Sequence, residues 1–330
     1  MALLNVPVID IEPFRRGGDS EKTAVAERVA EACRDIGFLI IAGHGIDPAL
    51  IDRVDGVSRR FFDMPLDDKM RVARPAKDVT RGYIPLEGEA VAASRGETTA
   101  GDLNESFMIG PVDVPDGDNY YTADAAGRHF HPNLWPEAPA ELHAAYGEYY
   151  RAMGGLAATI MRIFAGALHL PADFFDTKLH RHISRLRVRN YPAPSVPPSP
   201  GQLRVGAHSD YGSLTILKAE ANPGGLQVFN KASEWVDVPI IEGTFIVNLG
   251  ELMARWTNDQ WVSTLHRVVN PPPDRAAGSR RQSIVFFHNP NYDAAVECIP
   301  SCTWPGNPPR YPPTTSGDHL RHQFVRTQKA

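Results

Sequence analysis

Apolar residues recur at helical spacing in three segments of the first half of the chain. The pattern predicts one helix from Ser20 to Asp35 and a second from Pro48 to Phe62. A longer stripe, which includes Met153 and Ile160, predicts a helix between about residues 138 and 168. A stripe of this kind packs against a sheet, so we expect helices on the outside of a β-structure.

The second half of the chain shows short apolar runs separated by turn residues. Arg185 to Tyr191 alternates charged and apolar residues, as a half-buried strand does, and a Pro/Ser loop covers residues 192 to 201. Short strands at this spacing are typical of a sandwich or jelly roll, and 29 prolines and 27 glycines supply the turns. The later runs are Leu214 to Leu217, Leu226 to Phe229, Trp235 to Pro239, Thr244 to Leu249, Thr264 to Val269 and Ser283 to Phe287.

The remaining segments complete a fold that is mainly β with flanking helices (α+β). Short strands are predicted from Val6 and from Gly37, residues 75 to 135 are irregular, and a closing helix is predicted from Ser316 to Arg326. We expect an N-terminal region over residues 1–180 that contains the long supporting helix. A jelly-roll core over 181–295 and a C-terminal tail over 296–330 follow, and the three regions should form one compact unit.

Composition and charge exclude several classes of function. The net charge of −5 and the absence of a basic block give no support for nucleic-acid binding. The longest apolar runs are too short to cross a bilayer, and the N-terminal residues lack the pattern of a signal peptide. Three cysteines are too few for a disulfide framework, so reduced thiols are favoured over a Cys298–Cys302 pair. A cytoplasmic protein follows, and we favour a monomer.

The candidate metal ligands begin with His208 and Asp210. Side chains two residues apart on a strand share a face, so this pair is expected to grip one ion, although His-x-Asp often occurs by chance. His266, in a later apolar run, is the best third ligand. Two histidines and one carboxylate make the facial triad of non-haem iron(II) oxygenases. Three protein ligands leave positions open for dioxygen and a chelating co-substrate, whereas structural zinc takes four.

A second constellation predicts an anion clamp. Arg281 and Ser283 share a strand face, and a guanidinium with a hydroxyl binds a carboxylate well. Such a clamp suits the far carboxylate of 2-oxoglutarate, with Tyr191 as a third hydrogen-bonding group. Taken alone, Arg281 reads as a solvated surface residue, and the neighbouring Arg280 makes the choice of arginine depend on the phase of the strand.

Over nearly its whole length, the chain resembles the isopenicillin N synthase-like branch of the 2-oxoglutarate/iron(II) dioxygenases. The stretches that carry the resemblance begin near the N-terminus and continue through the catalytic core. They are Val6-Pro-Val-Ile-Asp, Gly37-Phe-Leu-Ile-Ile-Ala-Gly-His-Gly-Ile, Asp102-Leu-Asn-Glu-Ser-Phe, Asn133-Leu-Trp-Pro, Leu186-Arg-Val-Arg-Asn-Tyr-Pro, His208-Ser-Asp-Tyr-Gly, Leu265-His-Arg-Val and Arg281-Gln-Ser-Ile.

The resemblance implies a double-stranded β-helix, a jelly-roll fold, and it assigns the candidate residues. The family's catalytic iron ligands fall on His208, Asp210 and His266, and its co-substrate residues fall on Arg281, Ser283 and Tyr191. The implied cofactors are Fe(II), 2-oxoglutarate as co-substrate and dioxygen, with ascorbate in a supporting role. The implied reaction hydroxylates, desaturates or cyclises a small organic metabolite and releases succinate and carbon dioxide.

Other readings stay open beside this one. A same-fold oxidase of the isopenicillin N synthase type uses no 2-oxoglutarate, and a non-catalytic jelly-roll protein keeps only the pocket. A zinc hydrolase is disfavoured, because no general-base Glu stands beside a His in a strand context. The substrate should be set by residues 75–135, the loop 192–201 and the C-terminal tail.

Several polar residues are expected to have structural roles. Many plant members carry Asn where this chain has Arg189, which we expect to face solvent rather than a carboxylate. We expect His288 at the surface or in a turn, and His44 to hold a turn between two glycines. Asp102 and Glu105 are expected to be turn and cap residues rather than acid/base catalysts.

Overall fold

The computed structural model describes residues 6–329, except for 77–78, 98, 128 and 223. The first five residues, on which the signal-peptide prediction partly rests, lie outside this range. None of the helices within these described ranges is long and apolar enough to span a membrane. Cys33, Cys298 and Cys302 are free thiols, as the sequence predicted.

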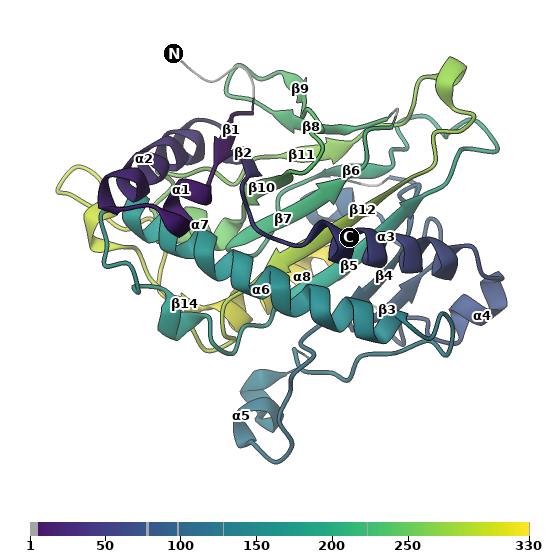
Figure 1. Cartoon of the computed structure of the whole chain (residues 1–330), viewed down its shortest axis with the longest axis horizontal. Helices are drawn as coiled ribbons and strands as arrows, with labels where there is room; N and C mark the ends of the chain where they lie inside the picture. Colours follow the sequence, from purple (N-terminus) through teal and green to yellow (C-terminus); the bar gives the residue numbers. More distant parts are fainter. Residues whose placement is uncertain (1–5, 77–78, 98, 128, 223, 330) are drawn as a thin grey trace.

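The helices lie largely where apolar periodicity predicted them, and α6 runs along the outer face of the sheet (Figure 1). The stripe of α6 is buried, with Met153 and Phe164 fully enclosed. The helices are α1 (Glu12–Arg16), α2 (Asp19–Asp35), α3 (Pro48–Phe62), α4 (Leu66–Met70), α5 (Asn119–Thr122), α6 (Leu142–Ala167), α7 (Glu251–Trp256) and α8 (Ser316–Lys329). Short 3-10 helices are η1 (Val91–Arg95), η2 (Asp124–Ala126), η3 (Asp176–Lys178), η4 (Pro273–Arg275) and η5 (Pro300–Cys302).

Two sheets form the β-structure. The larger has the strand order β1-β2-β10-β7-β12-β5-β4-β3, the smaller β6-β11-β8-β9, and β13 pairs with β14. Apart from the parallel β1–β2 pair, neighbours are antiparallel. The strands are β1 (Val8–Asp10), β2 (Phe38–Ala42), β3 (Gly82–Ile84), β4 (Glu105–Ile109), β5 (Arg185–Tyr191), β6 (Val205–His208), β7 (Leu214–Ala219), β8 (Leu226–Phe229), β9 (Trp235–Asp237), β10 (Phe245–Leu249), β11 (His266–Val268), β12 (Arg281–His288), β13 (Ala295–Val296) and β14 (Thr314–Thr315).

Two apolar clusters show how the layers pack. The main cluster joins the outer face of the large sheet, including Leu186 and Ile284, to the helices. A second cluster joins the inner faces of the two sheets and includes Tyr191, Val205 and Val228. Two facing, mainly antiparallel sheets with helices on the outer face agree with the predicted fold class, a jelly-roll core with flanking helices.

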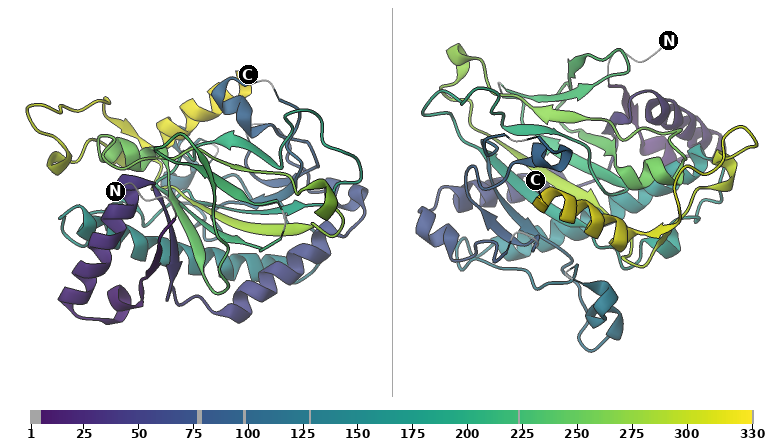
Figure 2. Two further views of the ribbon diagram at one scale, coloured as in Figure 1. Left: turned by 90° about the horizontal axis from the view of Figure 1, so that it is seen from above. Right: turned by 180° about the vertical axis from the view of Figure 1, so that it is seen from behind.

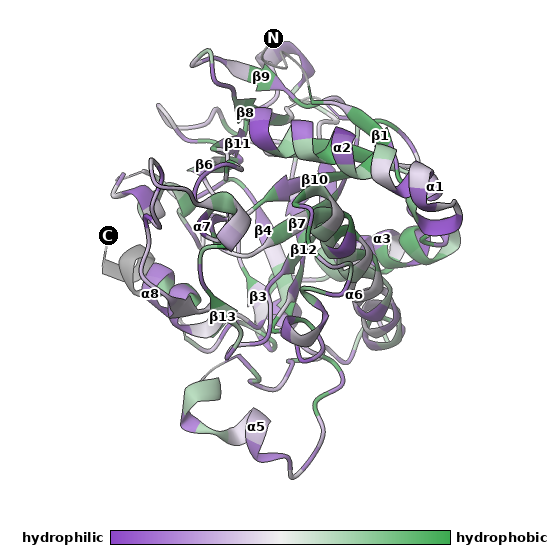
Figure 3. Ribbon diagram, turned by 90° about the vertical axis from the view of Figure 1, so that its left-hand side faces the viewer, coloured by the Kyte–Doolittle hydropathy of each residue, from purple (hydrophilic) through white to green (hydrophobic). Residues whose placement is uncertain are grey.

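Two segments outside the sheets shape the surroundings of the core. The region of α5 projects away from the strands (Figures 1 and 3). The C-terminal α8 crosses the side opposite α6 and contacts η1, as the view from behind shows (Figure 2). The segment around η1 and the helix α8 thus lie together over the inner side of the strands.

The segment from Arg185 to Tyr191 is a strand, as predicted, but the prediction that it is half-buried was wrong. Every residue of β5 is buried. The apolar face packs into the main core, and the charged face turns into the space between the sheets. There it is covered by the segment around Glu89 and, near Arg185, by Phe324 of α8.

Candidate iron and co-substrate site

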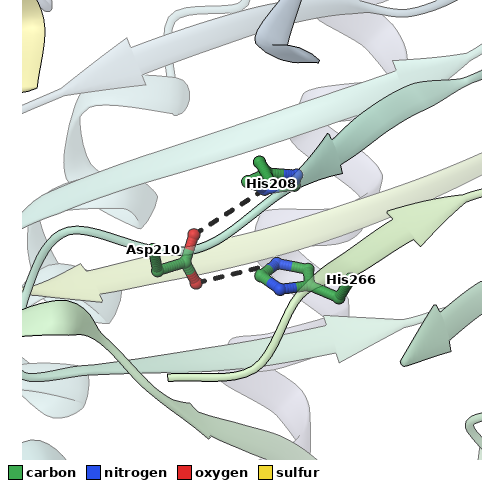
Figure 4. Close-up of side chains that lie close together, drawn as sticks. All are labelled: His208, Asp210 and His266. Atoms are coloured by element: carbon green, nitrogen blue, oxygen red, sulfur yellow. Dashed lines mark ion pairs between the residues drawn. The ribbon is translucent and has the colours of Figure 1, made fainter. Parts of the chain in front are cut away.

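The three predicted metal ligands meet between the sheets (Figure 4). His208 is the last residue of β6 and lies directly opposite His266, the first residue of β11. Asp210 follows two residues after the strand ends. One ligand atom from each of the three lies within 4.8 Å of the others, the only such cluster of potential metal ligands within the described ranges.

Backbone carbonyls fix the tautomer of both histidines. His208 Nδ1 lies 2.9 Å from the carbonyl oxygen of Gly206, and His266 Nδ1 lies 3.1 Å from that of Thr264. A carbonyl only accepts, so each Nδ1 carries the proton and donates it. Each Nε2 therefore keeps its lone pair, and these two atoms face Asp210 at 3.7 and 3.9 Å.

Two side chains also orient the carboxylate of Asp210. Its Oδ2 accepts hydrogen bonds from Thr215 Oγ1 at 2.6 Å and from Asn248 Nδ2 at 2.7 Å. Both of these hydrogen bonds are on Oδ2, so the lone pairs of Oδ1 are available to a metal ion. Outer partners of this kind are what hold a metal ligand in place.

The protonation states suit metal binding. Burial lowers the pKa of His208, and the nearby His266 lowers it further, against the pull of Asp210. Burial raises the pKa of Asp210, but the two histidines and the hydrogen bonds from Asn248 and Thr215 outweigh it, so the net pKa is lowered. A neutral imidazole and an ionised carboxylate are the forms that bind a cation.

The predicted anion clamp also comes together between the sheets. Tyr191 lies opposite Arg281 in the β5–β12 pairing, and its hydroxyl lies 3.3 Å from that of Ser283. Arg281 is 1% exposed and donates from one terminal nitrogen to Gly224 O, while its Nε has no hydrogen-bond partner among the described residues. Arg280 points away and pairs with Asp63. The phase of the strand therefore turns Arg281 toward Tyr191, while its role in an anion clamp stays a prediction.

These residues fit the groups that the sequence implies. The two Nε2 atoms and Oδ1 are borderline and hard donors, a set that suits iron(II). An unpartnered buried guanidinium nitrogen is costly unless a ligand satisfies it, and a carboxylate matches the guanidinium fork. The hydroxyls of Tyr191 and Ser283 stand beside it as further donors.

Arg189 is buried, which corrects the expectation that it faces solvent. It lies on the inner face of β5 and donates to Asn104 Oδ1 at 2.9 Å. Two strand positions away, Arg187 donates to Glu89 and to Ser106. Both arginines line a cavity of about 460 Å³ that is also lined by His208 and Asp210.

The structure corrects the expectation for His288. It ends β12, is 1% exposed and contacts Ser213 Oγ through Nδ1, because β12 continues to pair with β7 as far as Leu214. His44 holds its turn as predicted, since it accepts from Ile46 N and bonds Gly243 O.

Asp102 and Glu105 both have structural roles, but of different kinds. Asp102 accepts from the backbone nitrogens of Val91 and Gly206, and so ties η1 to β6 as a turn residue would. Glu105 does not cap a turn. It lies within β4 and forms a buried ion pair with Lys69.

Comparisons with known proteins agree with this geometry. Residues 6–138 match the model of the N-terminal region of the non-haem dioxygenase in morphine synthesis, and residues 182–290 match the 2OG-Fe(II) oxygenase superfamily. The chain is 33% identical to the 2-oxoglutarate-Fe(II) type oxidoreductase hxnY of Emericella nidulans, over 99% of this chain and 91% of the relative. It is 30% identical to validamycin A dioxygenase of Streptomyces hygroscopicus, over 98% and 86%.

The fold is shared with solved structures as well. A full-length Neurospora crassa protein, crystallised with alpha-KG (2-oxoglutarate) and thymine, superposes with a TM-score of 0.84 at 30% identity. That match covers 98% of this chain and 97% of the other. The chain belongs to the 2OG-Fe(II) oxygenase superfamily. It is an iron(II)- and 2-oxoglutarate-dependent oxidoreductase that acts on small molecules, with dioxygen as the oxidant.

Sequence reasoning missed several residues around the site. Thr215 and Asn248, which orient Asp210, lie on predicted strands, but nothing marked their partner. Glu89 lies in the segment read as irregular, so no periodicity pointed to it. The alternation of Arg185, Arg187 and Arg189 was visible, and it did signal that the three share one face.

Proposed function

We propose that His208, Asp210 and His266 hold Fe(II), through the two Nε2 atoms and Asp210 Oδ1. Arg281, Ser283 and Tyr191 hold the far carboxylate of 2-oxoglutarate. The observation that supports the co-substrate site best is the buried Arg281 guanidinium, whose Nε lacks a partner in the part of the chain that the structure describes. Its position on the sheet that faces β6 and β11 supports a clamp that shares the space between the two sheets with the proposed triad.

The iron and co-substrate, when bound, supply the oxidation of a C–H bond by dioxygen with release of succinate and carbon dioxide. The chain's own task is to position and shield. The carbonyls of Gly206 and Thr264 keep the imidazoles in the binding tautomer, and Thr215 and Asn248 aim the carboxylate. The buried strands exclude water from the space where the substrate must approach.

The substrate is proposed to be a small organic metabolite that enters the cavity beside His208 and Asp210. Relatives carry names such as validamycin A dioxygenase, which indicates organic substrates of modest size. Hydroxylation, desaturation and ring closure are the outcomes that this chemistry offers. We further propose that the protein acts as a cytoplasmic monomer and binds neither nucleic acid nor membrane, in line with its net charge of −5.

The test is succinate release. With Fe(II), ascorbate and 2-oxoglutarate, a panel of metabolites should include members that stimulate succinate formation in step with their own oxidation. Omission of 2-oxoglutarate should stop both. Substrate oxidation that continues without 2-oxoglutarate would instead support the isopenicillin N synthase-type oxidase and overturn the role given to Arg281.

A further inference from the structure

One face of β5 carries a row of cationic and phenolic side chains. Residues two apart on a strand share a face, so Arg185, Arg187, Arg189 and Tyr191 all point into the space between the sheets. Tyr191 marks the co-substrate end of the row, opposite Arg281. Arg185 marks the other end, opposite Phe287.

The two middle arginines are satisfied by the protein itself. Arg187 bonds Glu89 Oε2 at 2.6 Å and Ser106 Oγ at 2.7 Å, while Arg74 bonds the other oxygen of Glu89. These arginines hold the pKa of Glu89 at about 2 against the effect of burial, so the carboxylate is charged. Arg189 bonds Asn104.

Arg185 has no comparable partner. Its residue is 8% exposed, and its contact is the ring of Phe324, 4.6 Å from the guanidinium carbon. Across the part of the chain that the structure describes, no side chain or carbonyl hydrogen-bonds or ion-pairs with its guanidinium. An unsatisfied cation at this depth is costly unless an anion completes it.

The charged neighbour of Arg185 is itself a cation. Arg81 is buried nearby, and its guanidinium donates hydrogen bonds to the backbone carbonyls of Thr80, His129 and His131. Burial and the charge of Arg81 lower the pKa of Arg185 to about 9. The surroundings of Arg185 are therefore short of negative charge.

The guanidinium lines the cavity that reaches His208 and Asp210. Apolar side chains also line this cavity: Met108 from β4, Phe287 from β12, and Leu320 and Phe324 from α8. Seen from behind, α8 lies across this side of the strands beside η1 (Figure 2). Arg185, which has no anionic partner among the described residues, thus lies beside apolar side chains in a cavity that reaches the proposed iron ligands. The Glu89 carboxylate in the same lining is already paired with Arg187 and Arg74.

The 2-oxoglutarate held by the clamp is too short to satisfy Arg185. Arg185 and Tyr191 are six positions apart on one strand, and a strand rises about 3.3 Å per residue, so their backbones are about 20 Å apart. A five-carbon diacid does not span that distance. A second anion is needed.

We propose that Arg185 binds the carboxylate of the substrate, and that the substrate is a small acid with an apolar body. The body would lie against Phe287 and Phe324 and extend from Arg185 toward the iron ligands. This inference rests on the proposed function, because it assigns the substrate class of the same site.

The test uses the protein loaded with Fe(II) and 2-oxoglutarate under anaerobic conditions. Aryl and alkyl carboxylic acids are each titrated beside their neutral amides, for example 3-phenylpropanoate beside 3-phenylpropanamide. Succinate release in air is measured for the same pairs. The best acids should bind about tenfold or more tighter than their amides, since a charge-assisted pair replaces a neutral contact.

Variants assign that preference to one residue. Arg185→Gln should remove the acid-over-amide preference while 2-oxoglutarate affinity stays unchanged, and Arg185→Lys should keep part of it. Arg181→Gln removes an arginine that pairs with Asp118 and does not line the cavity, so it should leave the preference intact.

The outcomes separate this inference from the proposed function. A wild type that binds 2-oxoglutarate but shows no preference for any acid over its amide overturns the inference alone, and this comparison requires no variant to fold. The same acid preference in Arg185→Gln as in wild type also overturns it. A wild type that binds no 2-oxoglutarate contradicts the proposed function.

Discussion

Tyr191 lies directly opposite Arg281 in the β5–β12 pairing, and the Arg281 guanidinium carbon is 5.1 Å from the centre of the Tyr191 ring. The contact joins two strands whose apolar faces belong to the main core. Both side chains are almost fully buried, so the packing around the two strands holds them in place. This rigidity suits a clamp that must bind the same co-substrate in every turnover.

Arg281→Gln should weaken 2-oxoglutarate binding on the order of 100-fold, since loss of a buried charge-assisted contact costs about 3 kcal/mol. Isothermal titration under anaerobic conditions measures this directly. Arg280→Gln is the matched control, because Arg280 pairs with Asp63 on the other face of the strand. Equal losses in the two variants would contradict the clamp.

Thr215→Val should weaken Fe(II) binding about tenfold or more, because the Asp210 carboxylate loses one of the two donors that orient it. The substitution preserves shape, so the protein should fold normally. Titration with Fe(II) gives the affinity. Thr244→Val, whose hydroxyl bonds only Ile241 O at an exposed turn, should leave it unchanged. An unaltered affinity in Thr215→Val would show that Asp210 needs no such support.

Glu105→Ala should reduce the free energy of unfolding by about 3 kcal/mol, because it leaves the buried ammonium of Lys69 without its ion-pair partner. Tyr83 and Asn190 lose their acceptor as well. Urea denaturation measures the change. Glu148→Ala breaks an exposed ion pair with Arg53 and should cost less than about 1 kcal/mol. Similar losses in both would contradict the structural role of Glu105.

Stability should fall as the pH drops below about 6.5, in part because of His288. Burial lowers the pKa of His288 well below 6.5, and His182 lowers it further. Below pH 6.5, His288 is protonated in the unfolded chain but stays neutral in the folded protein. The free energy of unfolding therefore falls on acidification, by up to about 1.4 kcal/mol per pH unit.

His288→Asn should flatten this dependence between pH 7.5 and 5.5, measured by urea denaturation at each pH. His131→Asn alters an exposed histidine and should leave the slope unchanged. A slope in His288→Asn equal to that of wild type would assign the acid sensitivity to other groups.

The sequence indicated which side chains of the proposed triad and clamp lie together, although Asp210 follows the end of β6 instead of lying on that strand as expected. His208 and Asp210 are close in the chain, and Arg281 and Ser283 share a face by simple alternation. The prediction of His266 needed the resemblance or the apolar context, and the structure supplies the reason: β11 pairs with β6 so that His266 faces His208.

The burial of the charged side chains on β5 depends on contacts with residues far away in the sequence, so the sequence pattern did not predict it. Arg187 is covered by its hydrogen-bond partner Glu89, which is 98 residues away in the sequence. Arg189 is covered in the same way by Asn104, which is 85 residues away. An alternating pattern of charge and apolar residues reads as half-exposed unless those partners are known. His288 was misplaced for a related reason, because the length of β12 is set by β7 rather than by its own residues.

The assignment of His208, Asp210 and His266 as the iron ligands can be tested by anaerobic titration of Fe(II) into the wild type and His266→Ala, with His131→Ala as a control. We expect one tight site in the wild type and in the control, and its loss in His266→Ala together with loss of succinate formation. Fe(II) affinity and succinate formation that survive in His266→Ala would contradict the triad as the iron site.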